Sequence, residues 1–179
     1  MFMALYPEVQ RKCQDEIDDI LGQKHPAIDD MSRMTYIMAT LMEIQRYSIV
    51  AQGTLLHSAM RDTEANGYYF KKGTIFIANI QKFLRDPKEF PEPESFNPER
   101  FICEDGKIKK IEYFVPFGIG KRICMGESLA KNEMFIFFVR FFQRMNVSCI
   151  DNQKPDPTQF TSGVTRIPKP FIVSVDLRA

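Results

Sequence analysis

One cysteine in this sequence lies in a setting suited to thiolate chemistry. Cys124 ends a glycine-rich loop, within the stretch 117–127 that reads FGIGKRICMGE, and an apolar segment typical of a buried helix follows it. Backbone N–H groups at the start of a helix favour a thiolate, and Arg122 adds a full positive charge. Gly118 and Gly120 allow the backbone to curl tightly and approach a flat group, because glycine lacks a Cβ. A thiolate beneath a planar ligand is the arrangement that haem iron uses to cleave an O–O bond.

Other sites that use similar residues fit this loop less well. A phosphate-binding loop would need Gly at position 115 and Ser or Thr at position 122, where the chain has Val and Arg. A dinucleotide-binding loop would need Gly or Ala in place of Ile123, and the four cysteines form no CxxC pair of the kind usual in zinc sites. A nucleophilic cysteine with His25 or His57 as its base stays open, as does a buried Cys124 that acts as a small hydrophobic residue.

The loop resembles the haem-binding segment of the cytochrome P-450 superfamily, Phe-Gly-x-Gly-Lys-Arg-x-Cys-x-Gly-Glu. Two further motifs occur in the order expected for that family. Glu43 and Arg46 match its Glu-x-x-Arg, and residues 96–101 (FNPERF) resemble its Pro-Glu-Arg-Phe segment. The stretch between them, which contains His57, is much like that of animal microsomal members. The resemblance runs from about Tyr6 to the C-terminus and corresponds to the C-terminal part of a family member.

The resemblance implies a role for each residue around the loop. Cys124 would be the axial ligand of the iron in haem b, and Arg122 would pair with a haem propionate. His57 would bind the second propionate, although a satisfied polar group at a strand end explains this residue equally well. Phe117 would pack near the haem and the cysteine. The glycines that would admit the haem are Gly118, Gly120 and Gly126.

The resemblance also implies a supporting charge network and a substrate pocket. Glu43, Arg46 and Arg100 would form a buried network that holds an irregular meander against a helix. From the residues alone, Glu43 and Arg46 could equally be an exposed helical pair that contributes a few tenths of a kcal/mol. The substrate pocket would be lined in part by Val50, Leu55 and Val164, whose apolar character suits a lipophilic substrate as well as an ordinary core.

The activity implied by the resemblance is that of a haem-thiolate monooxygenase. Such an enzyme inserts one atom of dioxygen into a lipophilic organic substrate and releases the other as water, with electrons from NADPH that arrive through a flavoprotein reductase. Microsomal relatives lie on the cytosolic face of the endoplasmic reticulum membrane through an N-terminal anchor. We expect this sequence to lack that anchor and the central oxygen-activating helix, and therefore to be inactive alone. The alternative is a non-catalytic haem-binding or interaction protein that keeps the scaffold.

Periodicity indicates a mainly α chain with small β-sheets (α+β), and the resemblance implies that this is the C-terminal portion of the cytochrome P-450 fold. We expect residues 1–179 to form a single partial domain. A net charge of +1 gives no indication of a nucleic-acid partner, and four unpatterned cysteines favour a reducing compartment. Helices are predicted over 7–21, 34–47 and 128–145. Strands are predicted at 53–56, on both sides of Asn66-Gly67, at 74–78 and within 161–175, with an irregular meander over 86–98.

Overall fold

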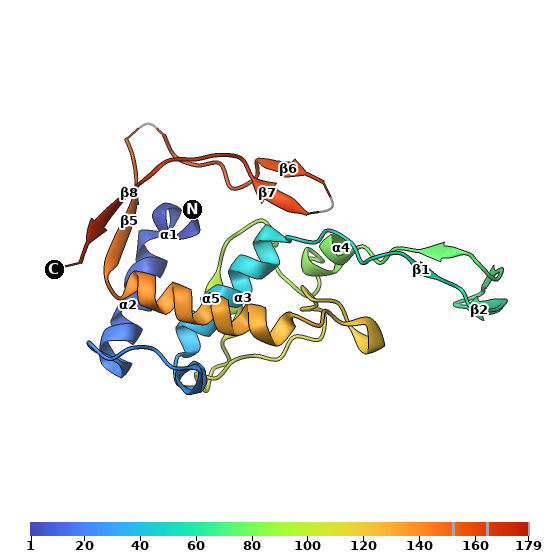
Figure 1. Cartoon of the computed structure of the whole chain (residues 1–179), viewed down its shortest axis with the longest axis horizontal. Helices are drawn as coiled ribbons and strands as arrows, with labels where there is room; N and C mark the ends of the chain where they lie inside the picture. Colours follow the sequence, from blue (N-terminus) through green and yellow to red (C-terminus); the bar gives the residue numbers. More distant parts are fainter. Residues whose placement is uncertain (152, 164, 179) are drawn as a thin grey trace.

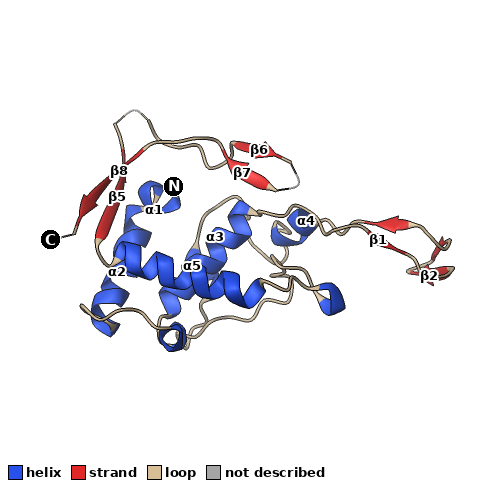
Figure 2. Cartoon of the chain, viewed as in Figure 1, coloured by secondary structure: helices blue, strands red, loops and turns tan. Residues whose placement is uncertain are grey.

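The computed structural model describes residues 1–151, 153–163 and 165–178, and it has the expected α+β architecture, with helices in the body and short antiparallel strands around it (Figure 2). The body consists of α2 (Pro7–Ile20), α3 (Thr35–Ser48) and α5 (Glu127–Phe142), with the one-turn helix α1 (Phe2–Leu5) at the N-terminal end. Among the described residues, no helix is both long and apolar enough to span a membrane.

Helix α2 forms where the apolar periodicity predicts it. Pro7 occupies the first helical turn, where its missing N–H removes no helical hydrogen bond. Cys13 and Ile17 are fully buried on the inner face. The helix ends before Gly22, which adopts a positive φ of 56°.

The first turn of helix α3 is capped by a side chain from α2. Met34 precedes it and provides no side-chain cap. The two carboxylate oxygens of Glu16, on α2, instead accept the backbone N–H groups of Tyr36 and Ile37, each at 2.8 Å. Burial raises the pKa of Glu16 above its ordinary value, while these backbone hydrogen bonds oppose the shift.

An aromatic cluster closes the core between the N-terminal helices and the meander. The ring of Phe2 stacks on that of Phe96 with centroids 4.7 Å apart and meets the ring of Tyr47 edge-on at 5.3 Å. Aromatic pairs in these geometries add stability beyond their buried area. Residues of α1, α3 and the meander are therefore held in one core.

Helix α5 differs from its prediction in length and in burial. Phe135 and Val139 are fully buried, whereas Phe137 is 72% exposed, so in this chain one face of the apolar helix faces the core and another faces solvent. The helix ends at Phe142 instead of residue 145, because the following residues form β5 (Met145–Cys149), which pairs with β8 (Val173–Leu177).

A narrow β-ribbon extends away from the helices (Figure 1). Strand β1 (His57–Ser58) pairs with β4 (Ile75–Phe76), and β2 (Thr63–Ala65) pairs with β3 (Tyr68–Phe70) through the predicted Asn66-Gly67 turn. Both turn residues have positive φ, which is the geometry that favours this dipeptide. The prediction of a strand at 53–56 is wrong: Thr54 bonds to Ala78 through its backbone and its hydroxyl, and the segment is irregular.

Short elements complete the fold. Helix α4 (Ile80–Leu84) follows the ribbon and was not predicted, and the meander after it is irregular, as expected, up to the 3-10 turn at Pro98–Phe101. A second 3-10 turn, Gly120–Arg122, lies inside the cysteine loop. The hairpin of β6 (Phe160–Ser162) and β7 (Arg166–Pro168) is joined to the body by a hydrogen bond from Arg166 N–H to the carbonyl of Val50.

Candidate functional site

The cysteine loop is held by its own backbone. The N–H of Cys124 donates to the carbonyl of Phe117 at 3.0 Å, and its carbonyl accepts the N–H of Glu127 at 3.3 Å. These two bonds close the loop on one side and join it to the start of α5 on the other. The side chain of Cys124 is exposed. The fold therefore presents a thiol at the end of a tightly closed loop.

Glycine is favoured in the loop for two different structural reasons. Gly118 and Gly120 adopt φ of 79° and 74°, a region that strongly favours glycine. A Cβ added to either would meet no atom within 4 Å, so the space beside them is open. Gly126 caps α5 at an ordinary φ of −88°, and a Cβ there would lie 3.9 Å from the sulfur of Cys124.

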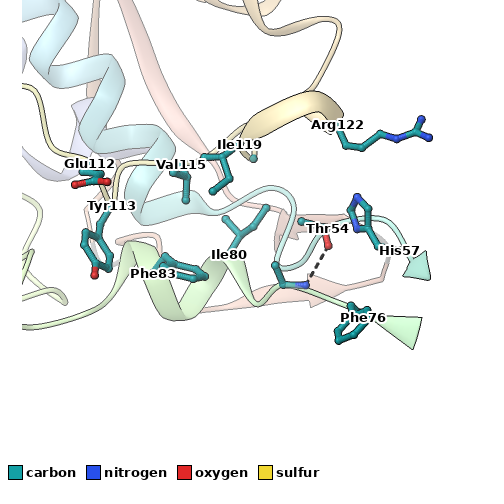
Figure 3. Close-up of a pocket in the computed structure, with 12 residues that line it drawn as sticks. Thr54, His57, Phe76, Ile80, Phe83, Glu112, Tyr113, Val115, Ile119 and Arg122 are labelled. Carbon is teal, nitrogen blue, oxygen red and sulfur yellow. Dashed lines mark hydrogen bonds between the residues drawn. The ribbon is translucent and has the colours of Figure 1, made fainter. Parts of the chain in front are cut away.

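A cavity of about 540 Å³ lies beside the loop, and Figure 3 shows its lining side chains. His57 comes from β1 and Arg122 from the loop, and the fold brings these distant residues to the same part of the cavity (Figure 3). The remaining lining is largely apolar and comes from the segment after α3, the ribbon, α4 and the start of the loop: Thr54, Phe76, Ala78, Ile80, Phe83, Glu112, Tyr113, Val115, Gly118 and Ile119.

Other residues singled out from the sequence lie outside the lining of this cavity. Cys124 follows Arg122 by two residues but is not part of the lining. Phe117 is half-buried, and the ammonium of Lys131 lies 5.8 Å from the centroid of the Phe117 ring. Val50 and Leu55 are 58% and 82% exposed. The prediction for Val164 falls outside the described residues.

Glu43 and Arg46 form a fully buried ion pair. Arg46 Nε donates to Glu43 Oε2 at 2.7 Å, and Arg46 Nη2 donates to Glu43 Oε1 at 2.9 Å. Neither side chain is exposed. Arg100 donates from Nε to the same Oε1 at 3.2 Å, and the backbone N–H of Asn97 also donates to it at 2.8 Å. The carboxylate of Glu43 thus meets two guanidinium groups and one backbone donor.

The two arginines also bond to backbone carbonyls at the end of α4 and in the meander. Arg46 Nη1 donates to the carbonyls of Leu84 and Pro93, at 3.1 and 2.8 Å. Arg100 Nη1 donates to the carbonyl of Pro91 at 2.7 Å, and both arginines reach the carbonyl of Ser95. An irregular segment cannot satisfy its carbonyls by regular secondary structure, so these side chains do it instead.

The remaining cysteines lie in different surroundings. Cys13 is buried between α2 and α3, with its sulfur 3.4 Å from the hydroxyl of Thr40, and burial raises its pKa to about 12. Cys149 donates to the carbonyl of Ala4, and Cys103 is exposed in a loop elsewhere. A thiol in the position of Cys13 is inert, since the thiolate is the reactive form.

Comparison with known proteins decides the family. The family model described as Cytochrome P450 matches residues 1–175. This chain belongs to the cytochrome P450 family. It is 37% identical to human cytochrome P450 2U1 over 179 residues, which cover 99% of the chain and 33% of that protein. It is 38% identical to rat cytochrome P450 2C13, male-specific, over 173 residues (96% of the chain, 35% of that protein) and 39% identical to rat cytochrome P450 2B2 over 180 residues (99% and 37%).

Membership in the cytochrome P450 family confirms the resemblance inferred from the cysteine loop and the expected α+β fold class. The matched region includes the whole loop, the Glu43–Arg46 motif and the segment 96–101. The chain spans about a third of the length of the curated P450 relatives it matches.

The cavity walls contain residues that the P450 motifs did not indicate. Phe83 lies in α4 and Tyr113 precedes the loop, and their ring centroids are 6.1 Å apart. Each is an ordinary apolar residue in the sequence, and no motif marks them. Tyr113 lies shortly before the loop in the sequence, whereas Phe83 lies close to none of the motifs.

Proposed function

We propose that this chain supplies the haem-holding loop of a cytochrome P450 monooxygenase, with Cys124 as the axial ligand of haem b. The observation that carries the proposal is the arrangement of three side chains. Arg122 and His57 line one cavity although 65 positions separate them in the sequence, and the exposed sulfur of Cys124 follows Arg122 by two residues.

The residues present suit the chemical groups of a haem. A thiolate is a suitable ligand for haem iron, and a buried propionate requires a cationic or hydrogen-bonding partner such as Arg122 or His57. The open space beside Gly118 and Gly120 would admit a flat ring to the backbone. Apolar side chains of the cavity wall, such as Ile80 and Ile119, would exclude water from one edge of that ring.

Bound haem would supply the iron chemistry that activates dioxygen, inserting one oxygen atom into a lipophilic organic substrate. The residues of this chain would bind the haem and hold it in position. Glu43, Arg46 and Arg100 would fix the meander against α3, and thereby support the loop. Val50 and Leu55, whose apolar side chains are exposed, would be available to the substrate together with Val164.

We assign the complete oxygenation reaction to a protein as long as the P450 relatives, of which this chain spans about a third. Electrons would come from NADPH through a flavoprotein reductase, and the enzyme would work on the cytosolic face of the endoplasmic reticulum membrane. In the described part of this chain the cysteine is exposed and Gly118 and Gly120 face open space, so the site is not enclosed. We therefore expect the 179-residue chain to bind haem without completing the oxygenation.

A carbon monoxide difference spectrum tests the proposal. The chain would be reconstituted with haem and reduced, alongside Cys124→Ala and, as a matched control, Cys103→Ala, which removes another exposed cysteine. We expect the thiolate-type Soret band in the unmodified chain and in Cys103→Ala, and its loss in Cys124→Ala. A band that survives in Cys124→Ala would overturn the assignment of the ligand. Haem binding without any thiolate-type band would favour the non-catalytic haem-binding alternative.

A further inference from the structure

Lys131 on α5 contacts both flanks of the cysteine loop. Its ammonium lies 2.5 Å from Glu127 Oε1, one helical turn earlier, and 5.8 Å from the ring centroid of Phe117. A Glu four positions before a Lys is the favourable orientation for a helical ion pair, and a cation within about 6 Å of an aromatic ring is attracted to its face. One side chain thus joins the start of the helix to the start of the loop.

The two residues that Lys131 contacts are the two that hold the backbone of Cys124. Phe117 provides the carbonyl that accepts the Cys124 N–H at 3.0 Å. Glu127 provides the N–H that donates to the Cys124 carbonyl at 3.3 Å. A displacement of either flank would therefore move the cysteine, and Lys131 restrains both flanks at once.

We propose that Lys131 is a positioning residue for Cys124. Its charge holds Phe117 and Glu127 together, so that the loop keeps the thiol in one direction. This inference rests on the proposed function, in which Cys124 binds haem iron. The effect is moderate, because the side chains of Lys131 and Glu127 are 41% and 25% exposed and solvent weakens their attraction.

The test uses the full 179-residue chain with substitutions that separate charge from bulk. Lys131→Met keeps the aliphatic stem and removes the charge, and Lys131→Arg keeps a cation. Lys107→Met is the matched control: it removes a lysine that also forms an ion pair, with Asp105 at 3.1 Å, but lies outside the cysteine loop. Each variant would be loaded with haem, reduced and exposed to carbon monoxide. The readout is the ratio of thiolate-type to other Soret absorbance, measured together with the total haem bound and the melting temperature.

We expect this ratio to fall about threefold to fivefold in Lys131→Met, from the loss of one ion pair and one cation–π contact. Lys131→Arg should recover most of the ratio, and Lys107→Met should leave it unchanged. A role in general stability alone would lower the melting temperature and the total haem bound without changing the ratio, and that result would overturn the inference. Absence of the thiolate-type band from the unmodified chain would overturn the proposed function, and this inference with it.

Discussion

The charge network and the cysteine loop carry the two most specific motifs of the chain, and they differ in how far the chain itself completes them. Glu43 and Arg46 are fully buried, and carbonyls of α4 and the meander accept the remaining guanidinium donors. Cys124 is exposed, and Gly118 faces open space. The charge network is satisfied by its own surroundings, whereas the cysteine loop is ordered through its backbone and leaves the side chain of Cys124 exposed.

The difference follows from where the partners of each motif lie in the sequence. Glu43 meets Asn97 and Arg100, which are 54 and 57 positions away and belong to the same described body. A buried ion pair left incomplete would be very costly, so its partners must belong to the folded chain. A loop that binds a ligand must leave the side chains that contact the ligand accessible. In the cysteine loop, Cys124 is held through backbone hydrogen bonds and its side chain stays exposed.

The largest effect is expected from breaking the buried pair. Arg46→Met leaves the carboxylate of Glu43 buried without its bidentate partner, and it should lower the free energy of unfolding by about 3–5 kcal/mol. Urea denaturation would measure the loss. The matched control is Arg33→Met, which removes an exposed arginine from a pair with the same spacing, Asp30 and Arg33 at 3.1 Å, and should cost only about 0.2–0.5 kcal/mol. Equal losses in the two variants would show that burial does not distinguish these pairs.

A second comparison uses two thiols, one buried between α2 and α3 and one in the cysteine loop. Burial raises the pKa of Cys13 to about 12, so its thiol is almost entirely protonated at pH 8. Iodoacetamide should therefore alkylate Cys124 at least about a hundredfold faster than Cys13 in the folded chain. Peptide-resolved mass spectrometry would measure both rates, with exposed Cys103 as an internal reference. Alkylation of Cys13 at the rate of Cys103 would contradict the packing of α2 against α3.

The smallest of the three effects concerns the backbone of the loop. Gly118→Ala places a side chain at a φ of 79° and should cost about 1–2 kcal/mol through backbone strain alone, because the added Cβ meets no atom. Gly126→Ala, at a φ of −88°, should change stability by less than about 0.5 kcal/mol. Urea denaturation of both variants would compare them. If Gly126→Ala is the more damaging change, contact with the cysteine and not backbone strain limits the loop.

The sequence predicted well those elements whose cause is local. Helix α2 starts with Pro7 and ends before Gly22, and the turn at Asn66-Gly67 requires two positive φ angles that this dipeptide adopts readily. The sequence did not predict strand β5, because β5 pairs with a strand more than twenty residues later and only that pairing ends α5 at Phe142. Tertiary contacts thus override the apolar pattern at this point.

The candidate site shows the same division. Motifs identified the loop and the residues of the buried network, because each motif is a short run of unusual residues. The walls of the cavity were not identified, since Phe83 and Tyr113 are ordinary aromatic residues that become neighbours only when α4 packs near the loop. A contact between distant segments leaves no periodicity or spacing in a single sequence.

The hydrogen bonds from the start of α3 to Glu16 have a consequence for the order of folding. A helix nucleus is unfavourable by itself, and α3 has no capping side chain immediately before it. Because the carboxylate lies twenty positions upstream of Tyr36, the first turn of α3 gains its partner only after α2 has formed and come alongside. Formation of the first turn and docking of the two helices are therefore a single cooperative step, and the protection of the Tyr36 amide against hydrogen exchange would report that step.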